Sequence, residues 1–252
     1  MQTPYVKHSI KDTIATVEFF TPLHNSLPSS ILAELASTII LLGNDENCTV
    51  IILKSFGDKT FCAGASFDEL MAITTPEQGL HFFSGFANVI NAMRKCPKFI
   101  IGSIQGKAIG GGVGLAAACD FAVATKYASI KLSELSVGIG PFVVGPAVER
   151  KIGTAAAYEL AIDAANFRTA FWAKEKGLFA EVFENIEELD TYITKITKHL
   201  STQNPMAMAD IKAAFWSGTN HWETLLLERA AISGKLVLSN FTKKYISEFK
   251  AK

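Results

Sequence analysis

The chain has 252 residues, of which 24 are basic and 24 acidic, and 49% are hydrophobic. This length fits one large domain or a domain with an appendage, and the balanced charge excludes the basic excess typical of nucleic-acid-binding proteins. No apolar run reaches the roughly 18 residues of a membrane span, and the N-terminus has no apolar signal segment. The sequence therefore predicts a cytoplasmic protein with neither a membrane nor a nucleic acid as its partner.

Strand and helix patterns alternate over most of the chain. A helix is expected from Ser26, as its cap, through Pro28 in the first turn to a stop at Gly43. A further helix is expected over His81–Met93. Such alternation favours an α/β fold with a largely parallel sheet covered by helices. The predicted strands cover Tyr5–Ile10, Ile14–Phe19, Val50–Leu53, Phe99–Ile104, Phe121–Ala124 and Ser129–Lys131, and the segment Phe61–Ala65 follows a polar loop.

Helical periodicity dominates after about residue 185. Asn204 and Pro205 begin one helix, Ser217 and Gly218 interrupt it, and Trp222–Leu238 continues it. We therefore divide the chain into a mixed core, residues 1–195, and a helical region, residues 196–252. The apolar side chains of the second region call for a partner surface, which predicts a homotrimer or a dimer of trimers. These side chains are Trp216, Trp222, Leu225, Leu226 and Leu236.

A glycine-rich stretch, "AIGGGVGLAAACD", lies between two predicted strands, at 108–120. Gly112–Cys119 is small and apolar and is expected to form a short buried helix, so the glycines lie at its N-terminus. Bare N–H groups at a helix N-terminus can bind an anion or an oxyanion. The absence of Gly-Lys-Ser/Thr excludes a P-loop, and a dinucleotide fingerprint is matched only weakly, by Gly112, Gly114 and Ala117. Close packing of the helix on a strand is the remaining alternative.

A second stretch, "KTFCAGASFDEL" at 59–70, follows the predicted strand Val50–Leu53 in the same way. Ser66 is expected to cap a helix that begins near Phe67. The carboxyl ends of parallel strands meet at one edge of a sheet, so both stretches can deliver a bare N–H to one crevice. Two such donors are what a developing oxyanion needs.

Together, "FCAGAS", "GKAIGGGVGLAAACD" and "LSELSVGIGPF" resemble the crotonase superfamily of enoyl-CoA hydratases and isomerases, over nearly the whole chain. The stretch "LSELSVGIGPFVVGPAVERKIG" is most similar to the methylglutaconyl-CoA hydratase-type members. The resemblance implies a crotonase-like spiral of ββα units, a C-terminal helical trimerisation region and a coenzyme A thioester as substrate. It also implies no metal and no separate cofactor.

The resemblance also implies the site residues. The oxyanion-hole N–H groups fall on Ala65 and Gly111, and of the two glutamates of the hydratases one matches Glu134 while the other falls on Gly114. At the position after "AGA" where the family usually has an aspartate, this chain has Ser66. The stretch "NSL" at Asn25–Leu27 is similar to a family segment that lies along the CoA. The full set expected to bind substrate or CoA is Leu23, Asn25, Ala63, Gly64, Ser66, Phe67, Ile109, Gly114, Ser133, Gly138 and Phe142.

Glu134 is the expected proton carrier. Leu132, Leu135 and Val137 surround it in the sequence, and partial burial among apolar residues would raise its pKa toward neutrality. A surface glutamate in a loop is the alternative. We expect an enoyl-CoA hydratase with Glu134 as general acid and base. An enoyl-CoA isomerase and a non-catalytic acyl-CoA-binding protein are the alternatives.

Gly114 is expected to leave open space in place of the missing glutamate. That space predicts weak hydration of crotonyl-CoA and better activity on a branched or acidic enoyl-CoA.

Overall fold

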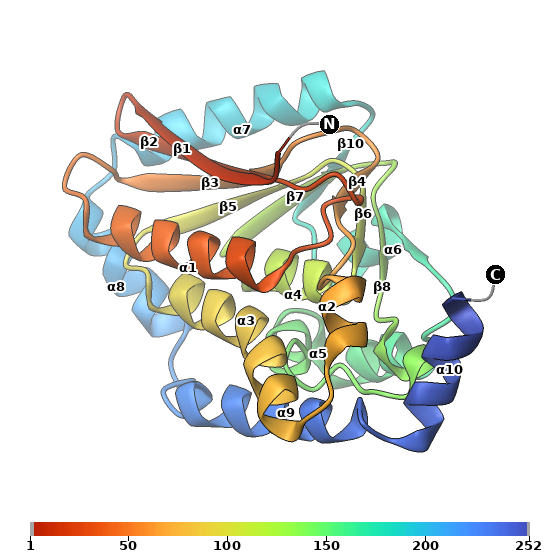
Figure 1. The fold of residues 1–252 in the computed structure, drawn as a ribbon. Coiled ribbons are helices and arrows are strands. Elements are labelled where there is room, and N and C mark those ends of the chain that lie inside the picture. Colours follow the sequence, from red (N-terminus) through yellow and green to blue (C-terminus); the bar gives the residue numbers. More distant parts are fainter. Residues whose placement is uncertain (1–2, 251–252) are drawn as a thin grey trace.

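The computed structural model describes the backbone of residues 3–250 and the side chains of residues 3–245; residues 251 and 252 of the predicted helical region lie outside it. A six-stranded sheet has the order β1-β2-β3-β5-β7-β10 and is parallel except for the β1–β2 hairpin (Figure 1). Its strands are β1 (Tyr5–Lys11), β2 (Ile14–Phe20), β3 (Val50–Ser55), β5 (Phe99–Ile104), β7 (Phe121–Thr125) and β10 (Glu181–Phe183).

A second sheet of short strands has the order β4-β6-β8-β9, with β4, β6 and β8 parallel and β9 antiparallel to β8. These strands are β4 (Thr60–Cys62), β6 (Lys107–Ile109), β8 (Ser129–Lys131) and β9 (Arg168–Thr169). Three successive turns of the chain, which begin with β3, β5 and β7, each add one strand to the large sheet, one to the small sheet and then a helical segment. The expected spiral of ββα units is confirmed, and the short strands β4, β6, β9 and β10 are those that the sequence did not predict.

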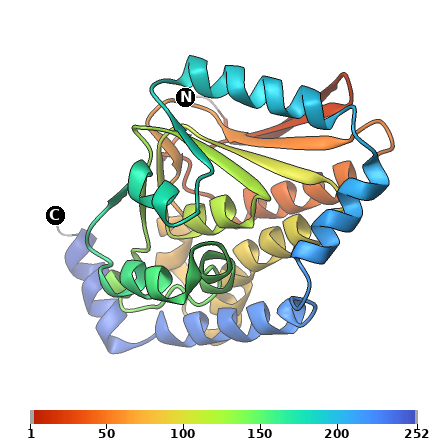
Figure 2. The same cartoon turned by 180° about the vertical axis from the view of Figure 1, so that it is seen from behind.

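Helices cover both faces of the large sheet. Figures 1 and 2 show α7 along one face and α1, α3 and α4 on the other, with α9 packed outside α3. The helices are α1 (Ser29–Asn44), α2 (Phe67–Ala72), α3 (Pro76–Lys95), α4 (Gly111–Ala118), α5 (Gly145–Ile162), α6 (Ala170–Glu175), α7 (Ile186–Leu200), α8 (Pro205–Phe215), α9 (Trp222–Leu236) and α10 (Asn240–Lys250), with a 3₁₀ turn, η1, at Glu134–Val137. No helix in the described range is both long and apolar enough to cross a bilayer.

Two boundaries differ from the expectation. Residue 195, the expected end of the mixed core, lies within α7 and not at a helix end, and the division of the chain into two regions stays a prediction. Helix α1 begins at Ser29, and the Ser26 hydroxyl donates instead to the carbonyl of Ala65 at 2.9 Å. Glu69 occupies the N-terminus of α1, because its Oε2 accepts from the backbone N–H and the hydroxyl of Ser29. The segment that carries Ala65 is thereby fixed to α1.

Asp120 joins the C-terminal helices to the sheet. Its Oδ2 accepts from the Ile100 N–H at 2.8 Å and from Lys212 Nζ at 2.7 Å, and its Oδ1 accepts from Trp216 Nε1 at 2.9 Å. Trp216 also packs edge-on against Trp222, which is buried, as is Leu226. Trp222 and Leu226 are covered by their own chain and do not argue for a partner surface, whereas Trp216, Leu225 and Leu236 are partly exposed. The homotrimer or dimer of trimers stays a prediction.

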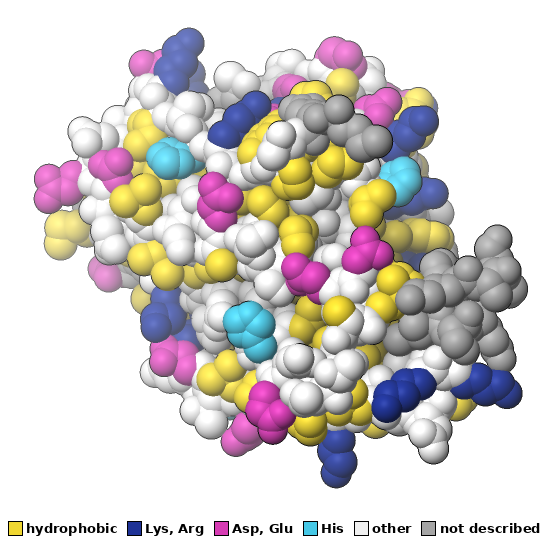
Figure 3. Space-filling model, in the orientation of Figure 1, with side chains coloured by type: hydrophobic (Ala, Val, Ile, Leu, Met, Phe, Trp, Pro, Cys, Tyr) yellow, Lys and Arg dark blue, Asp and Glu magenta, His cyan; other side chains and the backbone are white. Residues whose placement is uncertain are grey.

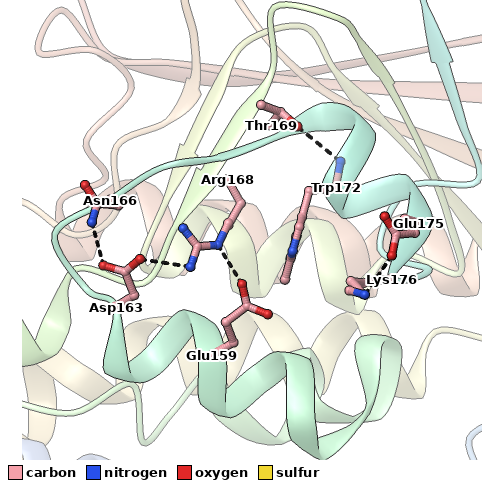
Figure 4. A network of polar contacts seen from close by, with 8 residues as sticks. All are labelled: Glu159, Asp163, Asn166, Arg168, Thr169, Trp172, Glu175 and Lys176. Carbon is pink, nitrogen blue, oxygen red and sulfur yellow. Dashed lines mark hydrogen bonds and ion pairs between the residues drawn. The ribbon is translucent and has the colours of Figure 1, made fainter.

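A polar network fixes the end strand of the second sheet. Figure 4 shows the Arg168 guanidinium between two carboxylates, with Nε 2.9 Å from Glu159 Oε1 and Nη2 2.8 Å from Asp163 Oδ2. Asn166 donates to the other oxygen of Asp163 at 2.7 Å. The network ties β9 to the end of α5, and β9 in turn pairs with β8, the strand that leads to Glu134.

Candidate active site

Three successive turns of the spiral end at one cavity. Strand β4 leads to Ala63–Ala65, β6 leads to Gly110 and Gly111, and β8 leads to Ser133 and Glu134. Because the three strands are parallel neighbours, their carboxyl ends lie at the same edge of the small sheet. All three segments line a cavity of about 590 Å³. The site is therefore built from residues far apart in the sequence.

Two backbone N–H groups are free at this edge. Ala65 and Gly111 donate to no acceptor within residues 3–245, although their neighbours are paired: the Gly64 carbonyl accepts from Leu27, and Ser66 donates to the Leu27 carbonyl. The two segments touch, since a Cβ built on Gly64 would lie 3.7 Å from the Gly111 nitrogen. Gly111 is also the first residue of α4, where the helix dipole is positive. This geometry suits a carbonyl oxygen that gains negative charge.

The glycines of the α4 stretch are required by close approach. A Cβ on Gly112 would lie 2.4 Å from the carbonyl oxygen of Cys62, and one on Gly111 would lie 2.2 Å from Cζ of Phe86. Gly110 has φ +53°, a conformation that favours glycine. The glycine-rich stretch thus both packs closely against its neighbours and presents a bare N–H group. Its interpretation as a packing element and its interpretation as an oxyanion site are compatible.

Glu134 lies beside these donors. A Cβ on Gly110 would be 2.9 Å from Oε1 of Glu134, so the carboxyl group lies over the residue before Gly111. The residue as a whole is half-buried, but its Oε2 is sealed from solvent and has no hydrogen-bond partner among the described residues. Burial raises the pKa of Glu134 to about 7, against a hydrogen bond from its own backbone N–H, which lowers it. A carboxyl group with this pKa can both take and give a proton near neutral pH.

The cavity walls are mainly apolar. Helix α3 contributes Phe82, Phe83 and Phe86, and residues 137–144 after Glu134 contribute a second apolar wall. The polar side chains at the cavity are Glu134, Asp68, His24 and three serines, and no Lys or Arg of the described chain lines it. Asp68 and His24 are exposed, so they lie toward its mouth. His81, on α3, is exposed and does not line the cavity.

Most of the expected site residues meet at this cavity. Besides Glu134, Ala65 and Gly111, the expected substrate-binding residues that line it are Leu23, Ala63, Gly64, Phe67, Ser133 and Phe142. Ile109 lines an adjoining cavity of about 780 Å³, which shares His24 and Ala63 with the first. Sequence reasoning missed Ser233, on α9, because nothing in the sequence brings α9 to this point.

Four residues that were expected to bind substrate or CoA line neither of these two cavities. Asn25 is buried; its Nδ2 donates to the carbonyls of Phe56 and Thr60, both at 2.9 Å, and its Oδ1 accepts from the Thr21 N–H. Its side chain therefore holds loops together and has no free group for CoA. Ser66 caps α2, as expected, by accepting from the Glu69 N–H.

Gly138 ends η1 with φ +78°, and its carbonyl accepts from the Thr242 hydroxyl of α10 at 3.3 Å. Gly114 does not leave open space, contrary to expectation. A Cβ there would lie 2.5 Å from Cγ1 of Val144, which lines the cavity in its place. The position of the missing glutamate is filled by an apolar side chain.

No group of three or more His, Cys, Asp or Glu side chains within the described residues is placed to hold a metal ion. Figure 3 shows acidic and basic side chains interspersed on the face seen there, in line with the balanced charge of the chain.

A double-sheet spiral with two free N–H groups and a buried carboxyl at one cavity defines a crotonase-fold protein. The structure of an enoyl-CoA hydratase from Bacillus halodurans superposes with a TM-score of 0.89 at 22% identity, covering 97% of this chain and 99% of that one. The family described as enoyl-CoA hydratase/isomerase matches residues 9–245. The chain belongs to the enoyl-CoA hydratase/isomerase family.

The relatives that the chain matches include proteins named as hydratases and one named as an isomerase. The chain is 35% identical over 198 residues to mitochondrial methylglutaconyl-CoA hydratase of Rattus norvegicus, which covers 77% of this chain and 62% of that enzyme. It is 31% identical over 208 residues to peroxisomal Delta(3,5)-Delta(2,4)-dienoyl-CoA isomerase of Arabidopsis thaliana, covering 76% of this chain and 73% of that enzyme. The family is therefore established, whereas these likenesses do not single out one reaction.

Proposed function

We propose that this chain moves a proton on an acyl-CoA thioester through an enolate. The N–H groups of Ala65 and Gly111 bind the thioester oxygen, and Glu134 carries the proton. The observation that carries the proposal is the Glu134 carboxyl group, with one sealed and unpartnered oxygen, beside Gly110 and the two free donors. The acyl chain lies in the cavity of about 590 Å³. The polar part of CoA extends into the adjoining cavity, whose lining includes Lys59 and Lys107 together with Asp58 and Glu187.

The single buried carboxyl group favours a double-bond shift. In that reaction the Glu134 carboxylate takes a proton from one carbon of the acyl chain, the thioester oxygen gains charge, and the same carboxyl group returns the proton two carbons away. One base is enough for both steps. Val144 fills the position of the second glutamate, and Asp68, the other carboxyl group at the cavity, is exposed. We therefore propose an enoyl-CoA isomerase as the first candidate.

Hydration is the second candidate, and the likeness to methylglutaconyl-CoA hydratases favours it. Glu134 would then both activate the water and protonate the α-carbon. The expected preference for an acidic enoyl-CoA has no support in the cavity, because a carboxylate there would lack a cationic partner among the described lining residues.

Product analysis separates these reactions. The wild-type enzyme is incubated with 3-hexenoyl-CoA, crotonyl-CoA and 3-methylglutaconyl-CoA, and products are followed by thioester absorbance and mass. We expect 3-hexenoyl-CoA to become conjugated without gaining water, and crotonyl-CoA to be hydrated slowly. Rapid addition of water would favour the hydratase, and binding of all three without turnover would leave the non-catalytic acyl-CoA-binding protein.

The pH dependence follows from the raised pKa of Glu134. The base form must be present to take a proton, so kcat/KM for isomerisation should rise about tenfold per pH unit below pH 7 and level off above it. The raised pKa of Glu134 has the opposite effect on the free energy of unfolding. Glu134 keeps its proton to a higher pH in the folded chain than in the unfolded chain, so stability falls as the pH rises. The contribution of Glu134 to the free energy of unfolding is complete below about pH 4.5 and is lost as the pH rises through 7. Initial rates and urea titrations across this range test both statements; an activity independent of pH between 5 and 8 would contradict the assignment.

A further inference from the structure

Ser233 places a free hydroxyl group at the acyl cavity. It is the one residue of α9 that lines the cavity, and it is 1% exposed. A buried helical serine can donate to the carbonyl four residues before it, as Ser84 does to Leu80 at 2.6 Å. The Ser233 hydroxyl has no hydrogen-bond partner within residues 3–245, and yet it is not among the sealed side-chain polar atoms of the described chain, Arg94 Nη2 and Glu134 Oε2. The hydroxyl group of Ser233 is therefore directed into the cavity, where it can bond to a ligand.

Helix α3 gives the position of Ser233 relative to the oxyanion site. The Phe86 ring lies against Gly111, and Gly79 lies against Gly234, the neighbour of Ser233, because a Cβ on Gly79 would be 2.6 Å from the Gly234 Cα. Phe86 and Gly79 are seven residues apart on α3, which corresponds to about 10 Å along a helix axis. Between these contacts, α3 presents Phe82 and Phe83 to the cavity. Ser233 thus lies at the far end of the acyl cavity from the thioester.

The chemistry of this end is polar but uncharged. Phe82 and Phe83 are packed edge to face at 5.0 Å beside it, and no described Lys or Arg reaches the cavity. A carboxylate here would be left without a countercharge, whereas an alcohol or ketone oxygen needs only one hydrogen bond. An unsubstituted alkyl end would leave the Ser233 hydroxyl without a partner.

We propose that Ser233 forms a polar subsite for an uncharged oxygen, a hydroxyl or ketone group, carried on the acyl chain well away from the thioester. This inference rests on the proposed function and defines its substrate class as medium-length enoyl-CoA thioesters with an oxygen near the chain end. Ser233 determines specificity and takes no part in proton transfer.

The test measures binding, which is independent of turnover. Calorimetry on the whole wild-type protein compares saturated acyl-CoA thioesters of increasing length with their ω-hydroxy derivatives. At the length that reaches Ser233, the hydroxy derivative should bind about tenfold more tightly, the scale of one buried neutral hydrogen bond. Ser233→Ala should remove this preference and should also improve binding of the unsubstituted chain, because the variant has no hydroxyl group to leave unpaired.

Ser84→Ala is the matched control. It removes a buried helical hydroxyl that bonds to the backbone and does not line the cavity, so the tenfold preference should persist. Equal affinity of each wild-type pair, over the whole length series, would overturn the subsite and leave Ser233 as the holder of a water molecule. That comparison needs no variant. Failure of every acyl-CoA to bind would instead overturn the proposed function, and the subsite with it.

Discussion

Glu134→Gln should lower turnover by about a hundredfold or more while acyl-CoA binding is retained. Glutamine keeps the shape of the side chain, but its amide cannot accept a proton near neutral pH, and the loss of a general base has this scale. Binding is retained because the two N–H donors and the apolar walls are unchanged. The measurement is kcat on the best enoyl-CoA substrate, together with the Kd of a saturated thioester.

Asp68→Asn is the matched control, since Asp68 also carries a carboxyl group at this cavity but is exposed on α2. Its turnover should stay close to the wild-type value. If Glu134→Gln remains fully active while Asp68→Asn is impaired, the proton carrier is Asp68 and the proposed role of Glu134 is wrong. Glu134→Gln should also flatten the rise of kcat/KM through pH 7, because the group that titrates there has been removed.

The sequence predicted the central strands β3, β5 and β7 of the large sheet well because most of their residues are buried on both faces. Strand β5 coincides with the predicted range, and β3 and β7 extend it by one or two residues. A continuous apolar run is the pattern of a central parallel strand. The strands that were not predicted, β4, β6, β9 and β10, have only two or three residues each, which is too few for a recognisable period. They pair because the larger strands before and after them have already placed the chain.

The site was predictable to the extent that local sequence sets backbone geometry. The two glycine-bearing turns were identified from "AGAS" and "IGGGVG", and the N–H groups of Ala65 and Gly111 meet no acceptor in the part of the chain that the structure describes. The structural role of Asn25 was not predictable, because the carbonyls that its amide binds belong to residues 31 and 35 positions later. Val144 over Gly114 and Ser233 at the cavity are also long-range contacts. Packing between distant segments decides which side chains fill the site. The sequence pattern of one segment carries no information about these contacts.

Gly111→Ala should abolish most of the activity by displacing the Phe86 ring. The added methyl group would lie 2.2 to 2.5 Å from the three atoms at the tip of that ring, so ring and helix cannot both stay in place. Overpacking of this kind typically costs about 1–3 kcal/mol of stability. A displacement of about 1 Å in the oxyanion donor can cost about a hundredfold in rate. We therefore expect a loss of about a hundredfold in kcat, with a smaller change in the midpoint of urea unfolding.

The second variant, Phe86→Leu, removes the three ring atoms that the new methyl group would meet. Alone, it should lower stability and change the acyl preference, because Phe86 lines the cavity. Combined with Gly111→Ala, it should restore much of the lost activity, so that the double variant is more active than Gly111→Ala alone. Kinetics of the four proteins on one short enoyl-CoA form a double-mutant cycle, and the coupling should be large because the two residues touch. Additive losses would mean that the Gly111 N–H is not positioned through this contact, and a fully active Gly111→Ala would remove that N–H from the oxyanion site.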